Sequence, residues 1–80
     1  MSESDVRAAV LAVLRSIAPE LEVETLDPAR PLREQIDLDS IDWLNVIVAL
    51  HERFGVDIPE ADYAKLVTLA DVVAYLAKKG

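Results

Sequence analysis

Apolar residues recur every three or four positions in three stretches of the chain, and in an α-helix this spacing places them on one face. The stretches predict three main helices, one near residues 4–17, one between Asp39 and Gly55, and one from Thr68 to Lys79. A short helical turn is expected from Pro59, at its first position, to about Lys65. The 80 residues are enough for one domain, spanning 1–80. The sequence therefore predicts an all-α fold, a small four-helix bundle.

Residues that favour helix ends stand at the expected boundaries. Ser2 or Ser4 can cap the first helix, Asp39 can cap the second, and Thr68 can cap the last. Gly55 suits the left-handed backbone conformation that ends many helices. The caps and the apolar spacing therefore predict the same boundaries.

Residues 18–38 show no lasting period, and Pro19, Pro28 and Pro31 interrupt the backbone there. We expect a long loop between the first two main helices. A short alternation over residues 21–25 leaves a strand open as an alternative. The side chains expected to hold the loop to the core are Leu21, Val23, Leu26, Leu32 and Ile36.

The apolar helix positions supply most of the expected core. Such stripes usually belong to the packed interior and not to a cofactor site. The core residues predicted in this way are Val10, Leu14, Ile17, Leu32, Val46, Ile47, Leu50, Phe54, Ile58, Leu66, Leu69, Val72 and Leu76.

The charge of the chain is strongly acidic and unevenly placed. Eight basic residues against fifteen acidic ones give a formal charge of −7. Residues 20–42 hold eight of the acids and only Arg30 and Arg33 as bases. Negative charge repels nucleic acid and anionic membranes and attracts basic protein surfaces. We expect protein partners with basic docking surfaces, no nucleic acid and no membrane insertion.

Composition also limits the chemistry and the location. The chain has no cysteine, which excludes disulfides, thiolate metal sites and a thiol nucleophile of its own. The first residues lack the basic stretch of a signal peptide, and no apolar run approaches the ~18 residues of a membrane span. The cytoplasm is the expected location and a monomer the expected state.

The residue pattern of a catalytic site is missing from the sequence. The single histidine, His51, is eleven positions from Ser40, about 16 Å along a helix, so it cannot act as the base of that serine within one element. A glycine-rich phosphate loop and the spacing of metal ligands are also missing. We expect a protein that is not an enzyme, with no catalytic residues, no metal site and His51 on the surface.

Ser40 is the residue whose predicted position favours covalent modification. If Asp39 caps the second main helix, Ser40 occupies the first helical position, where its hydroxyl is free to face solvent. A helix N-terminus tolerates an attached phosphodiester, although Asp37, Asp39 and Asp42 would repel one. These acids make better sense as contacts for a basic enzyme. An ordinary exposed helix-start serine remains the alternative.

The segment from Ile36 to Asp42, Ile-Asp-Leu-Asp-Ser-Ile-Asp, resembles the Asp-Ser-Leu signature of acyl and peptidyl carrier proteins. The resemblance covers essentially the whole chain, because the matching segments follow at the family's usual distances. They are Leu50 to Phe54, Val56 to Glu60, Lys65 to Leu69 and Val72 to Leu76.

The resemblance implies a covalent 4′-phosphopantetheine, taken from coenzyme A by a phosphopantetheinyl transferase and attached to Ser40, with Asp39 as motif residue and helix cap. The terminal thiol of this arm would carry acyl groups as thioesters to acyl-loading and acyl-processing enzymes of fatty-acid, polyketide or specialised lipid synthesis. The partner-binding positions carried over from the family are Ile41, Asp42, Trp43, Leu44, Val48 and Glu52. The lining that matches the family's acyl site is Val46, Ile47, Leu50, Ile58, Leu66 and Leu69, all equally well explained as core.

Several residues depart from the common fatty-acid pattern. Asn45 and His51 occupy positions where the family often has glutamate. The second main helix is therefore less acidic than usual, which suggests a different set of partners. Trp43 is either an exposed partner anchor or a ring packed against the long loop. Tyr63 is bulky where the family often has a small residue, and it would narrow acyl entry. Two alternatives to an acyl carrier remain open: a peptidyl or aminoacyl carrier, and an unmodified acidic interaction module.

Overall fold

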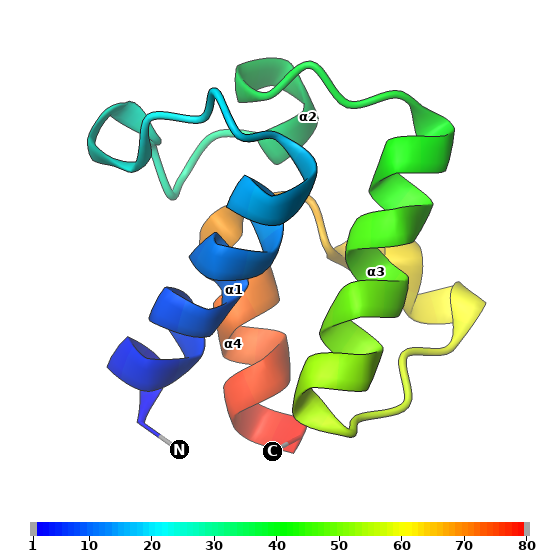
Figure 1. Ribbon diagram of the computed structural model, residues 1–80. Helices are drawn as coiled ribbons and strands as arrows, with labels where there is room; N and C mark the ends of the chain where they lie inside the picture. The colour runs from blue at the N-terminus through cyan, green and yellow to red at the C-terminus, as the bar shows by residue number, and fades with distance from the viewer. Residues whose placement is uncertain (1, 80) are drawn as a thin grey trace.

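The computed structural model describes residues 2–79 and contains three main helices that pack side by side (Figure 1). They are α1 (Glu3–Ile17), α3 (Ser40–Phe54) and α4 (Leu69–Lys79). Helix α1 runs opposite to α3 and α4 and packs against both. Both chain ends lie at one end of the bundle, and the long connection from α1 to α3 crosses the other. The predicted all-α architecture and its three main helices are confirmed.

The helix ends follow from local side-chain bonds. The Asp5 amide donates to Ser2 Oγ at 3.2 Å, which settles the choice between Ser2 and Ser4 as cap of α1. Gly55 ends α3 with φ 63°, the left-handed conformation that glycine adopts without a steric penalty.

Helix α4 begins with a reciprocal pair of side-chain bonds. Thr68 Oγ1 accepts from the Asp71 amide at 3.0 Å, and Asp71 Oδ2 accepts from the Thr68 amide at 3.1 Å. This pair satisfies two amides that the helix itself leaves unpaired.

The long connection contains more structure than the sequence predicts. Besides loop residues it holds a 3₁₀ turn, η1 (Val23–Thr25), and one turn of α-helix, α2 (Leu32–Gln35). The alternative of a strand over residues 21–25 is wrong, because η1 takes up residues 23–25 and the two residues before it form no strand. Within residues 2–79 the structure has no strand, only an isolated bridge between Pro31 and Thr68. The short helix is also a 3₁₀ segment, η2 (Glu60–Lys65), so Pro59 precedes it instead of being its first residue.

Gln35 fixes the shape of the connection. Its Oε1 accepts from the Asp27 amide at 2.7 Å, and its Nε2 donates to the carbonyls of Asp27 and Arg30 at 2.8 and 3.0 Å. The connection is also joined to the start of α4, since the Leu32 amide donates to the Val67 carbonyl at 2.8 Å.

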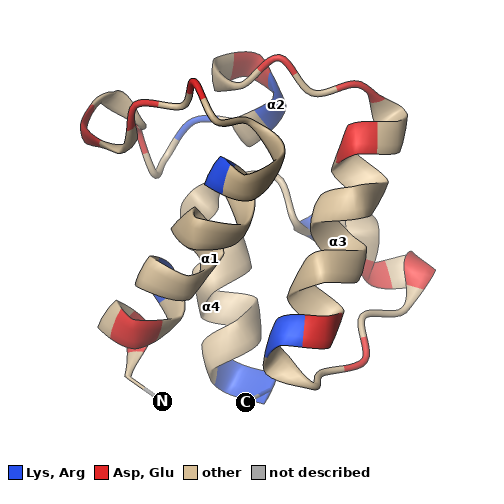
Figure 2. Cartoon of the chain, viewed as in Figure 1, with Lys and Arg blue, Asp and Glu red and all other residues tan. Residues whose placement is uncertain are grey.

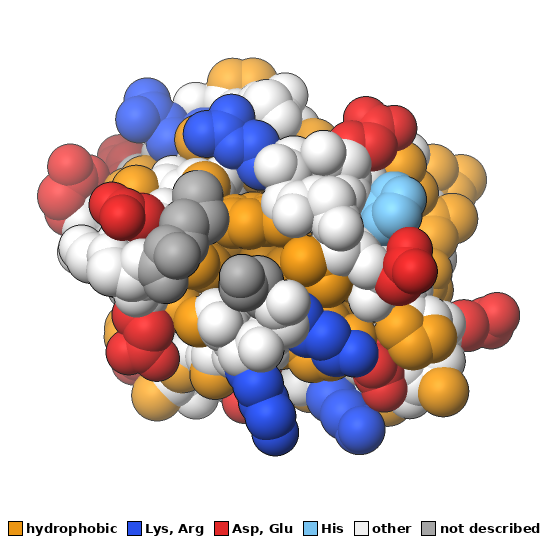
Figure 3. Space-filling model, turned by 90° about the horizontal axis from the view of Figure 1, so that it is seen from below, with side chains coloured by type: hydrophobic (Ala, Val, Ile, Leu, Met, Phe, Trp, Pro, Cys, Tyr) orange, Lys and Arg blue, Asp and Glu red, His pale blue; other side chains and the backbone are white. Residues whose placement is uncertain are grey.

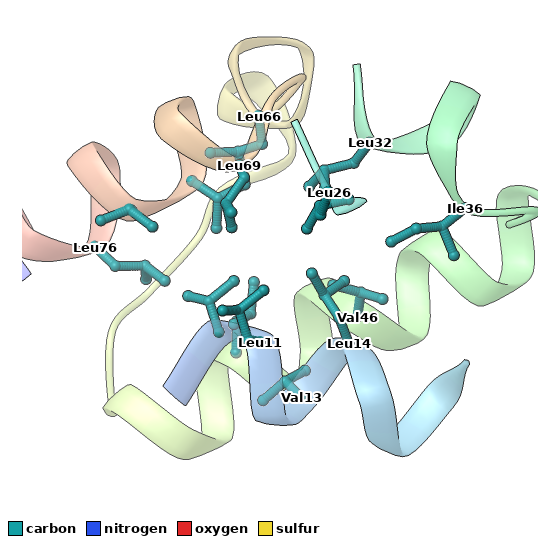
Figure 4. Close-up of a cluster of buried hydrophobic side chains, with 14 of the residues drawn as sticks. Leu11, Val13, Leu14, Leu26, Leu32, Ile36, Val46, Leu66, Leu69 and Leu76 are labelled. Atoms are coloured by element: carbon teal, nitrogen blue, oxygen red, sulfur yellow. The ribbon is translucent and has the colours of Figure 1, made fainter. Parts of the chain in front are cut away.

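One apolar core lies between the three main helices and the connection. Figure 4 shows side chains of α1, α3 and α4 converging with Leu26, Leu32 and Ile36 of the connection. Of the thirteen predicted core residues, Ile17, Phe54 and Ile58 are only partly buried, because they lie at its edge. Leu21 and Val23 are partly buried against the core as well. Leu26 and Ile36, which were expected to hold the connection to the core, are buried. The core residues missing from the prediction are Val6, Ala9, Leu11, Val13, Ala18, Leu38, Val56 and Val73.

Candidate functional site

Ser40 is the first residue of α3 and is exposed to solvent. The Asp39 carboxylate caps the helix by accepting from the Asp42 amide at 2.8 Å, and the Asp39 carbonyl accepts from the Trp43 amide at 2.9 Å. Capping is therefore complete without the serine hydroxyl, and within residues 2–79 the structure shows no hydrogen bond to Ser40 Oγ. Together these contacts leave the hydroxyl accessible at the positive end of the helix dipole.

Acidic residues surround this serine. Figure 2 shows acidic residues along the connection and at the start of α3, on both sides of Ser40 in the chain, while the middle of α3 carries no charge. Asp37 and Asp39 are exposed and Asp42 is partly buried. The negative charge is therefore concentrated at the end of the molecule that carries the serine.

One face of α3 presents apolar side chains to solvent below the serine. Ile41, Leu44 and Val48 are 71%, 47% and 45% exposed, although residues of this kind are usually buried. Glu52 is exposed four residues further on. Because positions three and four residues apart share a helix face, these four side chains form one stripe, which we call the α3 stripe.

Trp43 does not belong to the α3 stripe. Its side chain is partly buried against the core, in a hollow that it shares with Pro31 of the connection and Leu66. Of the two arrangements considered for Trp43, the structure shows the packed ring.

The boundary between α3 and η2, which we call the α3–η2 seam, contains two hollows. The near hollow is lined by Trp43, Leu66 and Tyr63, among others, and the far hollow by Ile47, Ile58 and Tyr63, among others. Of the six residues carried over as acyl lining, Val46, Leu50 and Leu69 line neither hollow and belong to the buried core.

His51 lies on the surface with half of its side chain exposed. Its Nδ1 is 2.8 Å from the Val56 carbonyl, a bond that fastens the chain after α3, and 3.9 Å from the Asp57 carboxylate. Figure 3 shows the histidine at the edge of the lower face, next to acidic side chains. Sequence analysis placed the residue correctly but missed this structural bond, which joins it to a residue beyond the helix end.

Asp62 of η2 and Tyr75 of α4 are joined by a hydrogen bond. The Tyr75 hydroxyl donates to Asp62 Oδ2 at 2.6 Å, and Lys65 Nζ lies 3.4 Å from Asp62 Oδ1. This bond, together with partial burial and the carboxylate charge, raises the pKa of Tyr75 to about 12. The same bond, aided by Lys65, lowers the pKa of Asp62 against the opposing effect of burial. The bond therefore needs a neutral phenol and an ionised carboxylate.

Titration of Tyr75 provides a test of this bond. A raised pKa means that its contribution to folding is complete below the ordinary tyrosine pKa of about 10 and is lost as the pH rises through about 12. The contribution of Asp62, whose pKa is lowered, is present above its ordinary value and is lost as the pH falls through the folded-state pKa. Phenolate absorbance should show a step near pH 12 that Tyr75→Phe removes. An absorbance change already complete near the ordinary pKa would contradict the bond.

Two further observations concern metal ligands and membrane spans. In the part of the chain that the structure describes, no three His, Cys, Asp or Glu side chains are grouped so that they could hold a metal ion. None of the described helices has the length and apolar character needed to cross a bilayer.

The fold and the exposed serine define a small helical domain that offers a hydroxyl at a helix start. The chain matches the family described as "Phosphopantetheine attachment site" over residues 8–76. It therefore belongs to the acyl carrier protein family, whose members are carriers and not enzymes. Membership implies that a phosphopantetheine attachment site is present, and that a phosphopantetheinyl transferase and acyl-processing enzymes are partners.

Similar proteins support this assignment over nearly the full chain. An acyl carrier protein of Campylobacter curvus is 38% identical over 76 residues, covering 95% of this chain and 92% of the relative. One from Thermosynechococcus vestitus is 35% identical over 81 residues, covering 99% and 96%. A solution structure from Anaplasma phagocytophilum, assigned to the acyl carrier proteins, aligns with a TM-score of 0.87 at 30% identity, covering 100% of this chain and 93% of that one. The chain thus carries acyl groups on phosphopantetheine for fatty-acid or lipid synthesis.

Proposed function

We propose that Ser40 is the residue that receives the 4′-phosphopantetheine. The observation that carries this proposal is an exposed hydroxyl at the first position of α3, with capping left to Asp39. The residues fit the group, because the open amides at the start of α3 favour a phosphodiester and the exposed position leaves room for a transferase.

The arm supplies the thiol that this cysteine-free chain lacks, and it carries the acyl group as a thioester. The chain itself positions the attachment residue. Asp39 fixes the start of α3 and so holds Ser40 at the surface. Carriage on a tether raises the local concentration of the acyl group at each enzyme that the carrier visits. The proposed cargo pathways are fatty-acid, polyketide or specialised lipid synthesis.

Incubation with coenzyme A and a broad-specificity phosphopantetheinyl transferase tests the proposal. The intact mass should rise by one phosphopantetheinyl unit. A mass that stays constant, under conditions that modify a control carrier, would contradict attachment at Ser40.

The proposed partner surface is the α3 stripe together with Asp42, supported from beneath by Trp43. Acidic residues at the serine end would meet basic residues of the partner, and the apolar part of the stripe would enter a shallow apolar surface. Such contacts are weak, as a carrier requires when it must dissociate from each enzyme after delivery. We further propose a monomer that binds neither nucleic acid nor membrane and works in the cytoplasm, the usual location of the family.

A charge placed in the α3 stripe should weaken the transferase reaction. Leu44 is 47% exposed, so Leu44→Glu is tolerated by the fold but forces an uncompensated carboxylate into an apolar contact. We expect kcat/KM for modification to fall about tenfold, the effect of an interface contact worth roughly 1.4 kcal/mol. Initial rates followed by mass spectrometry measure this fall.

Ala12→Glu is the matched control, because Ala12 is exposed but lies on α1, away from the α3 stripe and from Trp43. It adds the same charge and should leave kcat/KM within about twofold of the unsubstituted protein, since rim and distant positions contribute little. Equal losses from both substitutions would show that docking follows net charge and not the α3 stripe.

A further inference from the structure

A third hollow, between the end of α1 and the connection, has no part in the proposed function. Its apolar walls come from the buried Ala18, Leu26 and Ile36 and from the partly buried Leu21. We call it the connection hollow. None of its lining residues lines either hollow of the α3–η2 seam. Its volume of about 370 Å³ equals about twelve water molecules at ~30 Å³ each, so one long side chain of a partner fits inside.

Three carboxylates also line the connection hollow. Glu20, Glu22 and Asp37 are all exposed, so they form its rim. Within residues 2–79 the structure shows no ion pair to any of them, since the two pairs present belong to Asp57 and Asp62. In the same range no three acidic side chains stand close enough together to hold a metal ion. Separated carboxylates above an apolar floor instead match a side chain with a long aliphatic stem and a cationic head.

The walls of the connection hollow are held in shape by hydrogen bonds of the connection itself. The Gln35 side chain, one of the lining groups, bonds to the backbone of Asp27 and Arg30. Thr25, also in the lining, donates from Oγ1 to the Glu22 carbonyl at 3.0 Å. A hollow that is already formed costs less free energy of ordering when a partner side chain enters it.

The connection hollow lies at the same end of the molecule as Ser40. Because α1 runs opposite to α3, the end of α1 and the start of α3 share this end (Figure 1). Asp37 of the rim stands three residues before Ser40, and Ile41 of the α3 stripe directly follows the serine. The buried Leu38 fixes the segment between the hollow and the serine. The connection hollow therefore continues the proposed docking surface beyond the serine, toward α1.

We propose that the connection hollow receives an arginine side chain of the enzyme that docks at Ser40, as a second contact besides the α3 stripe. The aliphatic stem lies on the apolar floor, and the guanidinium donates to the carboxylates of the rim. Arginine suits the rim better than lysine, because its planar head presents several donors in fixed directions. The identity of the enzyme rests on the proposed attachment at Ser40, whereas the binding chemistry of the hollow does not.

A short peptide tests this chemistry on the unmodified full-length chain. The probe is acetyl-Ala-Arg-Ala amide, and its citrulline analogue keeps the shape without the charge. Titrated into ¹⁵N-labelled protein, the arginine peptide should shift the amides of residues 20–22 and 35–37, and the citrulline analogue should not. The double variant Glu20→Gln, Glu22→Gln should raise Kd about fivefold, because both rim contacts become neutral.

Glu24→Gln with Glu34→Gln is the matched control. Both glutamates are exposed on the connection and neither lines the hollow, so the pair removes the same charge elsewhere. Its Kd should stay within about twofold of the original value. Shifts spread evenly over the acidic surface, or equal shifts from the citrulline analogue, would overturn the arginine site.

The transferase reaction tests whether the docked enzyme uses the hollow. At low salt, Glu20→Gln with Glu22→Gln should lower kcat/KM for modification about fivefold, through KM, because the contact is remote from the reacting hydroxyl. The loss should shrink at 1 M salt, where charges are screened beyond ~3 Å. The control pair Glu24→Gln, Glu34→Gln should stay within about twofold. An unchanged KM in the Glu20, Glu22 double variant would overturn the contact with the enzyme.

The two proposals fail in different ways. Failure of the unsubstituted protein to gain the arm overturns the attachment at Ser40, while the peptide titration still decides the chemistry of the hollow. Normal modification of Ser40, with no change in peptide binding or KM in the rim variant, overturns the hollow and leaves the attachment intact. Circular dichroism should show every variant folded, because the four glutamates are exposed.

Discussion

Ser40→Ala protein should take up no phosphopantetheine and should remain folded. The substitution removes the only proposed acceptor oxygen, so we expect complete loss of the mass increase. The free energy of unfolding should change by less than ~0.5 kcal/mol, because the side chain is exposed and Asp39 does the capping. Intact mass after the transferase reaction and urea unfolding measure the two effects.

Ser4→Ala is the control for this experiment. Ser4 is also an exposed serine in the first turn of a helix, α1, but it is remote from the proposed docking surface. Its alanine variant should be modified like the original protein. Residual modification of Ser40→Ala would contradict attachment at Ser40. Unfolding of the variant would show that the serine has a structural role.

Leu14→Ala should destabilise the fold by about 2–5 kcal/mol. Leu14 is 1% exposed at the centre of the core, where α1 meets α3 and α4, and truncation leaves a cavity that the surrounding helices fill only in part. A small domain is stable by only about 5–15 kcal/mol, so this loss is a large share of the total. Urea unfolding followed by circular dichroism measures it.

Leu44→Ala makes the same chemical change on the exposed α3 stripe, where no packed cavity can form. It should change the free energy of unfolding by less than ~0.5 kcal/mol. Equal destabilisation by the two substitutions would show that the core is not centred on Leu14.

The features that the sequence predicted are local ones. The ends of α3 depend on Asp39, which bonds three residues ahead, and on Gly55, which needs no partner beyond its own helix. The position of Ser40 at the helix start follows directly from the cap. For this reason the candidate site was predictable in its central residue.

The features that the sequence did not predict depend on contacts between distant residues. Turns η1 and α2 are too short to show a helical period, and the bonds of Gln35 that shape the connection reach back eight residues. The bond from Tyr75 to Asp62 spans thirteen residues, and no spacing rule marks it. The packing of Trp43 was likewise undecided, because its neighbour Pro31 comes from the connection.

Peptide mapping of the modified protein is the most direct test of the central claim. Trypsin cleaves after Arg33 and Arg53, and in the resulting peptide, residues 34–53, Ser40 is the only serine, threonine or tyrosine. We predict that the phosphopantetheinyl mass is found on this peptide and on no other. Finding it on a peptide that carries Ser16, Thr25 or Thr68 would contradict the assignment of Ser40.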